Sequence, residues 1–247
     1  MQESTRQQYL QAMGIQMWEM KFSPEEVKAE TDIETNDGEM LVPTDAEKLK
    51  PAEISDNHSE LDWGSLRSRV ESCEDCQLHE SRIYPVFGAG NQTAKLMFIG
   101  EAPGADEDRQ GEPFVGQAGH LLDEMLLAIG FKREQVYITN MLKCRPPGNR
   151  DPESAELSCC ESFLLRQIAL LQPELIVALG RVAAQNLLKC DSKLGDLRGQ
   201  LQSVPGISPP ILVTYHPAYL IRKPLQKRKA WDDLKTALAV VQKGDQA

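Results

Sequence analysis

The chain has 247 residues, a length that favours one core domain with an appendage. Its formal net charge of −10 lies entirely in residues 1–62, which hold 5 Lys and Arg against 15 Asp and Glu, whereas residues 63–247 hold 22 of each kind. The first residues are polar and no apolar run approaches the roughly 18 residues of a membrane span, which argues against secreted and membrane-spanning classes and predicts a cytoplasmic protein without membrane contact.

The first 62 residues divide into two segments of different composition. Residues 22–62 contain many acids, scattered prolines and few aromatics, which predicts an acidic disordered linker. Residues 1–21 carry more apolar surface than a free tail needs, and the main apolar members are Tyr9, Leu10, Met13, Ile15 and Trp18. We interpret residues 1–21 as a partner-docking peptide. A helix that folds back on the core is the alternative.

From residue 63 onward, short apolar runs alternate with segments of helical periodicity. The predicted strands are Leu96–Ile99, Val136–Thr139, Leu175–Leu179 and Ile211–Thr214. Apolar residues at helical spacing predict amphipathic helices around residues 121–129 and 163–171. This alternation predicts an α/β domain over residues 63–247, in which helices cover both faces of a parallel sheet.

Polar residues follow each of the four predicted strands. Ligands of parallel sheets bind beyond the carboxyl ends of the strands. The residues at those ends are Gly100-Glu101, Asn140, Gly180-Arg181 and His216-Pro217. Together they predict a polar site with a carboxylate, an amide and an imidazole, although Gly180-Arg181 is more simply an ordinary strand-to-helix turn.

Six cysteines in a cytoplasmic chain favour metal ligands, a catalytic thiol or buried thiols over disulfides. Cys73 and Cys76 have chelate spacing, and Cys144 and Cys160 supply two further thiols. Four thiolates suit either zinc or a [4Fe-4S] cluster. By spacing alone the adjacent Cys159 could replace Cys160.

A run of five cations without an acid stands near the C-terminus, in YLIRKPLQKRK, residues 219–229. A solvated helix face and a polyanion-binding surface both explain such a run.

Three segments together resemble the family 4 uracil-DNA glycosylases, the iron-sulfur branch of that superfamily. They are GEAPGADEDRQGEPFVGQAG (residues 100–119), YITNMLKCRPPGNR (residues 137–150) and HPAYLIR (residues 216–222). The resemblance covers about residues 65–243. It implies a three-layer sandwich with a four-stranded parallel sheet, and hydrolysis of the N-glycosidic bond of deoxyuridine in DNA during base-excision repair. It further implies a [4Fe-4S] cluster on Cys73, Cys76, Cys144 and Cys160, which leaves Cys159 as the spare thiol.

The resemblance also assigns roles around a base that is rotated out of the DNA. Phe114 would stack on the pyrimidine, Asn140 would read its N3–H and O4, and Ala102 would contact it. His216 would donate to O2, on which negative charge develops as uracil leaves. Glu101 and Glu107 would hold the water and face the cationic sugar, in an order that we leave open.

The cation run then becomes a DNA-binding segment. Tyr219, Leu220 and Ile221 would fill the gap left by the extruded nucleotide. Phosphates would be held by Arg222, Lys223, Lys227 and Arg228.

Residues 6–18 resemble the N-terminal peptide of the psi subunit of bacterial DNA polymerase III, which implies docking on the chi subunit of the clamp loader and a place in the bacterial cytosol near the nucleoid. We expect a monomer. Two other classes of function compete: a non-catalytic uracil- or damage-binding iron-sulfur protein tethered to the replication machinery, and an electron carrier. A carrier has no need of Phe114, Asn140 and His216 at strand ends.

Overall fold

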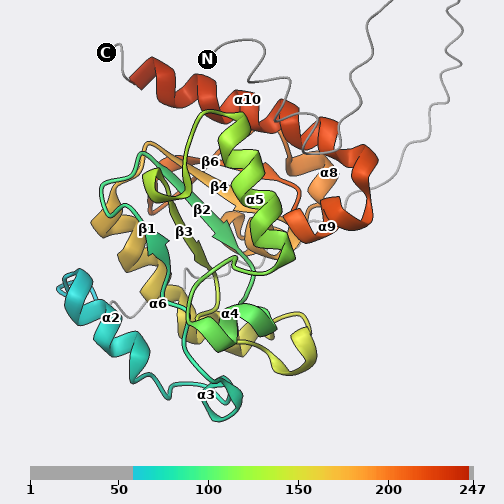
Figure 1. Ribbon diagram of the computed structural model, residues 1–247. Helices are drawn as coiled ribbons and strands as arrows, with labels where there is room; N and C mark the ends of the chain where they lie inside the picture. Colours follow the sequence, from blue (N-terminus) through green and yellow to red (C-terminus); the bar gives the residue numbers. More distant parts are fainter. Residues whose placement is uncertain (1–57, 245–247) are drawn as a thin grey trace, which may run out of the picture.

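The computed structural model of the chain describes residues 58–244 (Figure 1). The predicted docking peptide, residues 1–21, and residues 22–57 of the predicted linker lie outside the described residues. The described chain begins with His58, whose buried ring stacks on Phe163 with 4.4 Å between the ring centroids. Arg166 Nε then donates a hydrogen bond of 2.7 Å to the carbonyl oxygen of Leu61. These contacts attach residues 58–61 to helix α6 (Ser154–Leu171).

The described part of the chain forms a six-stranded mixed sheet with helices on both faces, in agreement with the expected α/β sandwich. The strands are β1 (Ala89–Gly90), β2 (Leu96–Gly100), β3 (Tyr137–Asn140), β4 (Leu175–Leu179), β5 (Leu201–Val204) and β6 (Ile207–Thr214). Their order across the sheet is β1-β3-β2-β4-β6-β5. The four central strands are parallel, and β1 and β5 pair antiparallel at the two edges.

The remaining elements connect these strands. The α-helices are α2 (Trp63–Glu71), α3 (Leu78–Ser81), α4 (Ala105–Gln110), α5 (Gln117–Ala128), α6 (Ser154–Leu171), α7 (Arg181–Leu188), α8 (Leu194–Leu197), α9 (Pro217–Arg222) and α10 (Lys227–Gly244). The 3-10 turns are η1 (Arg133–Gln135), η2 (Pro147–Asn149) and η3 (Pro224–Gln226). Within residues 58–244 no helix combines the length and the apolar character that crossing a membrane requires.

The central strands are apolar on both faces because both faces are covered. In β4, Leu175, Val177 and Leu179 pack against α5, α9 and α10, whereas Ile176 and Ala178 pack against α6 and α7. A strand buried on both sides reads as a continuous apolar run, which is why the sequence predicted all four central strands. Two packed helical layers with the sheet between them confirm the three-layer sandwich.

The two edge strands were not predicted. β1 has only two residues, too few to show any periodicity. β5 alternates between exposed and half-buried residues, and β6 begins four residues before the predicted start, at Ile207, with Pro209 and Pro210 inside it. Proline is tolerated where it has no strand hydrogen bond to donate, so it masks the first half of β6 in the sequence.

Candidate active site and cysteine cavity

The carboxyl ends of the parallel strands meet at one edge of the sheet, and the arrowheads of β2 and β3 point toward α4 (Figure 1). Asn140 ends β3 and is paired in register with Gly100, which ends β2. The Asn140 side chain is buried, and its Oδ1 atom has no hydrogen-bond partner. A buried polar atom without a partner costs about 1–3 kcal/mol, so this acceptor is the kind of group that a ligand satisfies.

Gly100 provides the space for two side chains that meet beside it. A Cβ atom on Gly100 would lie 2.6 Å from Phe114 Cζ and would also overlap Asn140 Oδ1. Only glycine therefore allows the amide and the aromatic ring to approach each other at this strand end.

Phe114 belongs to the loop between α4 and α5 and is nevertheless buried. Its backbone has φ of 54°, in the left-handed region that a bulky residue rarely adopts. Such strain occurs most often at functional sites. The Phe114 ring lies 5.5 Å from the His216 ring between centroids, with 30° between the planes. The side chain thus stands in a loop and also packs with the core cluster.

His216 follows β6 and is the N-cap residue of α9. Its Nδ1 atom accepts a hydrogen bond of 3.1 Å from the backbone N–H of Ala218. A neutral imidazole that accepts at Nδ1 carries its proton on Nε2, so the ring is a donor on its other side. Burial lowers the pKa of His216 to about 4; the positive charge of Arg222 lowers it further, and the negative charge of Glu107 opposes the shift. The ring is therefore a neutral donor at physiological pH.

Gly180 makes room for His216. A Cβ atom on Gly180 would lie 2.9 Å from His216 Cβ. Gly180 also has φ of 90°, which favours glycine. The neighbouring Arg181 is exposed and pairs with Asp151 at 2.7 Å, which fits the prediction of an ordinary turn for the arginine.

The two predicted glutamates have different surroundings. Glu107 is buried, and its carboxylate accepts three backbone N–H bonds of 3.0 Å, from Gly104, Val115 and Gly116. The carboxylate of Glu101 accepts no hydrogen bond from any of the residues 58–244. Its pKa is raised, mainly by burial and to a smaller extent by the negative charge of Asp151. Glu107 holds the loop that carries Phe114, whereas the carboxylate of Glu101 is available to bind something else.

The predicted DNA-binding segment is divided between core and surface. Leu220 is 1% exposed and packs in the core with α5 and α10, which argues against a role as a wedge between bases. Tyr219 is half-buried and stacks on Tyr215 at 5.1 Å, and Ile221 is also half-buried. Sequence reasoning overlooked Leu225, which is 92% exposed in the turn η3.

Cations surround this exposed leucine in the sequence. Arg222, Lys223 and Arg228 are exposed, and Lys227 is half-buried, which lowers its pKa. Proline at position 224 was the available signal in the sequence for a turn at Leu225, just before α10 begins at Lys227.

Five of the cysteines line one small cavity between α2, α6 and the segment after β3. They are Cys73, Cys76, Cys144, Cys159 and Cys160. Arg82 Nη1 donates to Cys144 Sγ at 3.1 Å. Burial raises the pKa of the Cys160 thiol to about 12, and the pKa of Cys144 is also raised by burial. Over residues 58–244, no three His, Cys, Asp or Glu side chains come close enough together to hold a single metal ion.

Cys159, Cys160, Cys190 and Ala102 have different surroundings. Cys159 is half-buried and its Sγ lies 3.4 Å from the carbonyl oxygen of Asp75, whereas Cys160 is buried in the apolar cluster with Leu142 and Cys144. Ala102, in the loop after β2, packs against that same cluster. Cys190 lies apart, against the layer that contains α6 and α7.

Lys143 lies between the end of β3 at Asn140 and the cysteine cavity, and it was not identified from the sequence. It is 1% exposed, and its Nζ donates to Thr139 Oγ1, Asn140 O and Gln167 Oε1 at 2.7–2.8 Å. It also lines the cysteine cavity. Burial lowers its pKa to about 7, while the charges of Cys160 and Cys144 would raise it. A run such as NMLKC in a sequence gives no sign that the lysine points inward.

Comparison with known proteins adds to this geometry. Residues 87–235 match the uracil DNA glycosylase superfamily. The chain is similar to the type-4 uracil-DNA glycosylase of Archaeoglobus fulgidus, with 45% identity over 172 residues that cover 67% of this chain and 86% of that protein. The type-4 enzyme of Pyrobaculum aerophilum is 41% identical over 180 residues, covering 70% and 92% of the two chains. The type-4 enzyme of Thermotoga maritima is 41% identical over 183 residues, covering 72% and 94%.

Proposed function

The chain belongs to the uracil DNA glycosylase superfamily, and from that premise we propose how its residues excise the base. It is a uracil-DNA glycosylase of type 4, which hydrolyses the N-glycosidic bond of deoxyuridine in DNA and releases uracil in base-excision repair.

Asn140 is the residue that we propose to select uracil. The observation that carries this role is the unpartnered, buried Oδ1 atom at the end of β3. Oδ1 accepts from uracil N3–H, and the amide nitrogen donates to O4. Cytosine presents the inverse pattern, with an acceptor at N3 and a donor at C4. A buried site whose polar atoms stay unpaired rejects the wrong base strongly.

Phe114 and His216 act on the two sides of the reacting base. A base cannot be attacked inside the duplex, so the nucleotide rotates into the pocket, where the Phe114 ring supplies a stacking face. As the bond to the sugar breaks, negative charge moves onto the uracil ring. The neutral His216 ring donates from Nε2 to O2, and because it was never charged, it stabilises the developing anion without first losing a proton.

The different hydrogen bonding of the Glu101 and Glu107 carboxylates supports different roles for the two residues. Glu101 has a carboxylate without hydrogen bonds from residues 58–244, so it is the better candidate to hold the attacking water and face the cationic sugar. Glu107 is a positioning residue, because three backbone N–H groups occupy its carboxylate.

Cys73, Cys76, Cys144 and Cys160 are our proposed ligands of a [4Fe-4S] cluster. The donor set fits, because these four thiols line one cavity and two basic side chains, Arg82 and Lys143, line it with them. A bound cluster would supply cross-links between α2, α6 and the segment after β3. Arg82 and Lys143 would offset its negative charge.

The segment after His216 is the proposed DNA grip. Arg222, Lys223, Lys227 and Arg228 would bind phosphates on either side of the lesion. Because Leu220 is buried, Leu225 is the better-placed apolar side chain to enter the base stack, with Tyr219 and Ile221 beside it at partial burial.

The expectation that residues 1–21 dock on the chi subunit of the clamp loader stays a prediction from sequence, as do the cytoplasmic location near the nucleoid and the monomeric state. An acidic linker would repel DNA, so residues 1–62 are better suited to a protein partner than to the substrate.

The Asn140 assignment has a direct test in base discrimination. Asn140→Asp replaces the amide donor by a carboxylate, which cannot donate to O4 when ionised. We expect at least a tenfold loss of the single-turnover rate on a uracil-containing oligonucleotide, and a smaller ratio of uracil to cytosine cleavage. Asn91→Asp is the matched control, because a carboxylate there still accepts from the Thr93 backbone and hydroxyl.

Unchanged discrimination in Asn140→Asp would reject Asn140 as the base reader. Wild-type protein that binds uracil-containing DNA without releasing the base would instead support the alternative, a non-catalytic binder.

A further inference from the structure

His216 receives its orientation from the backbone at the end of β6. The residue stands two positions after Thr214, the last residue of the strand, and its Nδ1 atom is held by the N–H of Ala218 in its own turn. The direction of the ring therefore follows the backbone of residues 214–218. Whatever fixes Thr214 also fixes His216.

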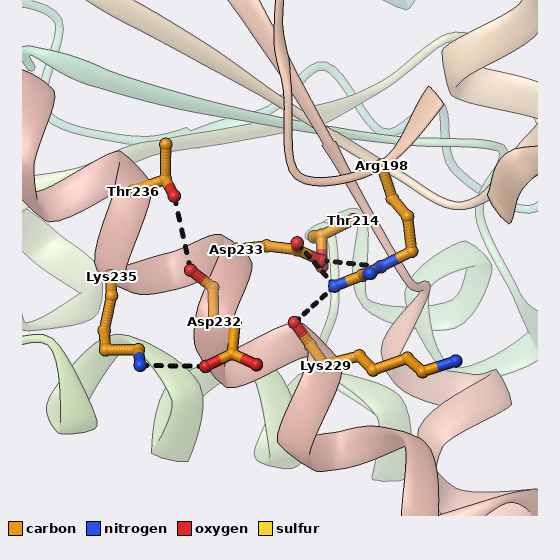
Figure 2. Close-up of polar contacts among 7 residues, drawn as sticks. All are labelled: Arg198, Thr214, Lys229, Asp232, Asp233, Lys235 and Thr236. Carbon is orange, nitrogen blue, oxygen red and sulfur yellow. Dashed lines mark hydrogen bonds and ion pairs between the residues drawn. The ribbon is translucent and has the colours of Figure 1, made fainter. Parts of the chain in front are cut away.

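Thr214 is held on two sides. Its side chain is fully buried, and its carbonyl oxygen accepts a hydrogen bond of 2.9 Å from the N–H of Gly180, the glycine against which His216 packs. Its hydroxyl donates to Asp233 Oδ2 at 2.7 Å, across to α10 (Figure 2). A buried threonine thus links the catalytic turn to an acidic group outside the pocket.

Asp233 is 1% exposed and shares its carboxylate with Arg198. Arg198 Nη2 lies 2.6 Å from Oδ1 and Nε lies 3.2 Å from Oδ2, which makes a two-point pair. The same Nη2 donates to the carbonyl oxygen of Lys229 at 2.6 Å, as Figure 2 shows. One arginine therefore joins the end of β6 to the first turn of α10, which carries cations of the proposed DNA grip.

The hydrogen-bond network of Thr214, Asp233 and Arg198 also contacts residues on either side of His216. The Arg198 guanidinium lies 5.4 Å from the centre of the Tyr215 ring, and Tyr215 stacks on Tyr219 at 5.1 Å. Gly199, directly after Arg198, donates from its N–H to the carbonyl oxygen of Val213 at 3.0 Å. Thr214, Tyr215 and Tyr219 are all held by groups that Arg198 and Asp233 organise.

A buried ion pair is a poor way to gain stability, because removing two charges from water costs about as much as their attraction returns, and apolar side chains of similar volume often serve as well. A two-point ion pair does, however, fix the relative position of its two side chains, which apolar packing does less strictly. We infer that Asp233 is a positioning residue that, with Arg198 and Thr214, sets the placement of His216 against the base and against the cations of α10. This inference rests on the proposed role of His216.

Thr214→Val and Thr214→Ser separate positioning from packing. Valine keeps the shape of threonine and removes the hydroxyl donor, whereas serine keeps the donor and loses a methyl group. We expect Thr214→Val to lower the single-turnover cleavage rate about tenfold to a hundredfold, since small displacements of a catalytic group cost that much. DNA affinity should stay within about twofold, and Thr214→Ser should recover most of the rate.

The matched control lies one residue away. Asp232 is exposed and pairs with Lys235 at 2.8 Å on the outer side of α10 (Figure 2). Asp232→Asn should leave rate and affinity unchanged, whereas Asp233→Asn should repeat the loss seen in Thr214→Val. If Thr214→Val cleaves at the wild-type rate, or if the serine and valine variants lose rate equally, the positioning role is wrong.

A readout without DNA distinguishes failure of this inference from failure of the proposed function. The ¹⁵N resonances of the His216 ring report its hydrogen bonds in the free protein. They should shift in Thr214→Val and Asp233→Asn and stay in place in Asp232→Asn. Unshifted resonances in the first two variants would overturn the inference even if the wild-type enzyme cleaves as expected. A shifted ring in a protein that does not cleave uracil would overturn only the proposed function.

Discussion

At the scale of single residues, burial sets the charge state of His216 that its proposed role requires. Its folded-state pKa of about 4 lies below the ordinary value of 6.5, and the first cause is loss of water around the ring. The unfolded chain therefore binds more protons than the folded one between these two values. Stability from this residue is complete above pH 6.5 and decreases as the pH falls toward 4.

This pKa can be measured by a ring-proton NMR titration of the wild-type protein, with His216→Gln to assign the signal. We expect the His216 signal to remain that of a neutral ring at pH 5.5 and to titrate near pH 4. Urea unfolding should show that the wild type loses more stability than His216→Gln between pH 7 and pH 5. A midpoint near 6.5 for His216 would contradict the neutral-donor mechanism.

The sequence was informative about which residues lie together at the strand ends and silent about their hydrogen bonds and protonation states. Asn140 and His216 could be recognised because each follows an apolar strand in a motif. The missing partner of Asn140 Oδ1 depends on atoms distant in the chain, such as Gly100 opposite Asn140, and the tautomer of His216 depends on the backbone turn that brings the Ala218 N–H to Nδ1. The same limit explains why Glu101 and Glu107 could not be told apart: the three N–H groups on Glu107 converge only when the loop folds back.

At the scale of elements, the loop from α4 to α5 depends on one carboxylate. Glu107 accepts from Gly104 before it and from Val115 and Gly116 after Phe114, so it closes the loop at both ends. We expect Glu107→Ala to lower the free energy of unfolding by about 3 kcal/mol, because three partly buried N–H groups lose a charged acceptor. Glu107→Gln should lose less, since its amide oxygen still accepts.

Urea denaturation checks this prediction, with Glu112→Ala as the control because Glu112 is exposed in the same loop. Equal stability of Glu107→Ala and Glu112→Ala would mean that the loop does not depend on the Glu107 carboxylate.

Elements buried on both faces could be predicted, and elements at the margin could not. The four central strands read as apolar runs, but the edge strands β1 and β5 are short or half exposed, and local periodicity does not distinguish them from loops. The wedge assignment of Leu220 stays a prediction that its burial argues against. An apolar residue beside a motif can face either core or solvent, and tertiary packing turned Leu220 inward and left Leu225 outward.

At the scale of the whole molecule, the cysteine cavity connects parts of the chain far apart in sequence. Cys73 follows α2, Cys144 follows β3 and Cys160 lies within α6. We expect the purified protein to be brown and to contain four irons per chain, and Cys160→Ser to lose both properties. Cys159→Ser is the control and should keep them, because the Cys159 thiol lies against the Asp75 backbone and we propose it as the spare thiol. The reverse result would mean that Cys159, and not Cys160, is the ligand. A colourless protein that contains zinc would reject the cluster.

The central claim is that uracil leaves as an anion stabilised by a neutral His216, and the most direct test compares catalysis with binding. The measurement is the single-turnover rate of uracil release from a labelled oligonucleotide, together with the DNA affinity, for the wild type and His216→Ala. We predict that the rate falls about 10²–10³-fold, the usual cost of one lost oxyanion donor, and that affinity changes little. Equal losses in rate and affinity, or an unchanged rate, would contradict the account.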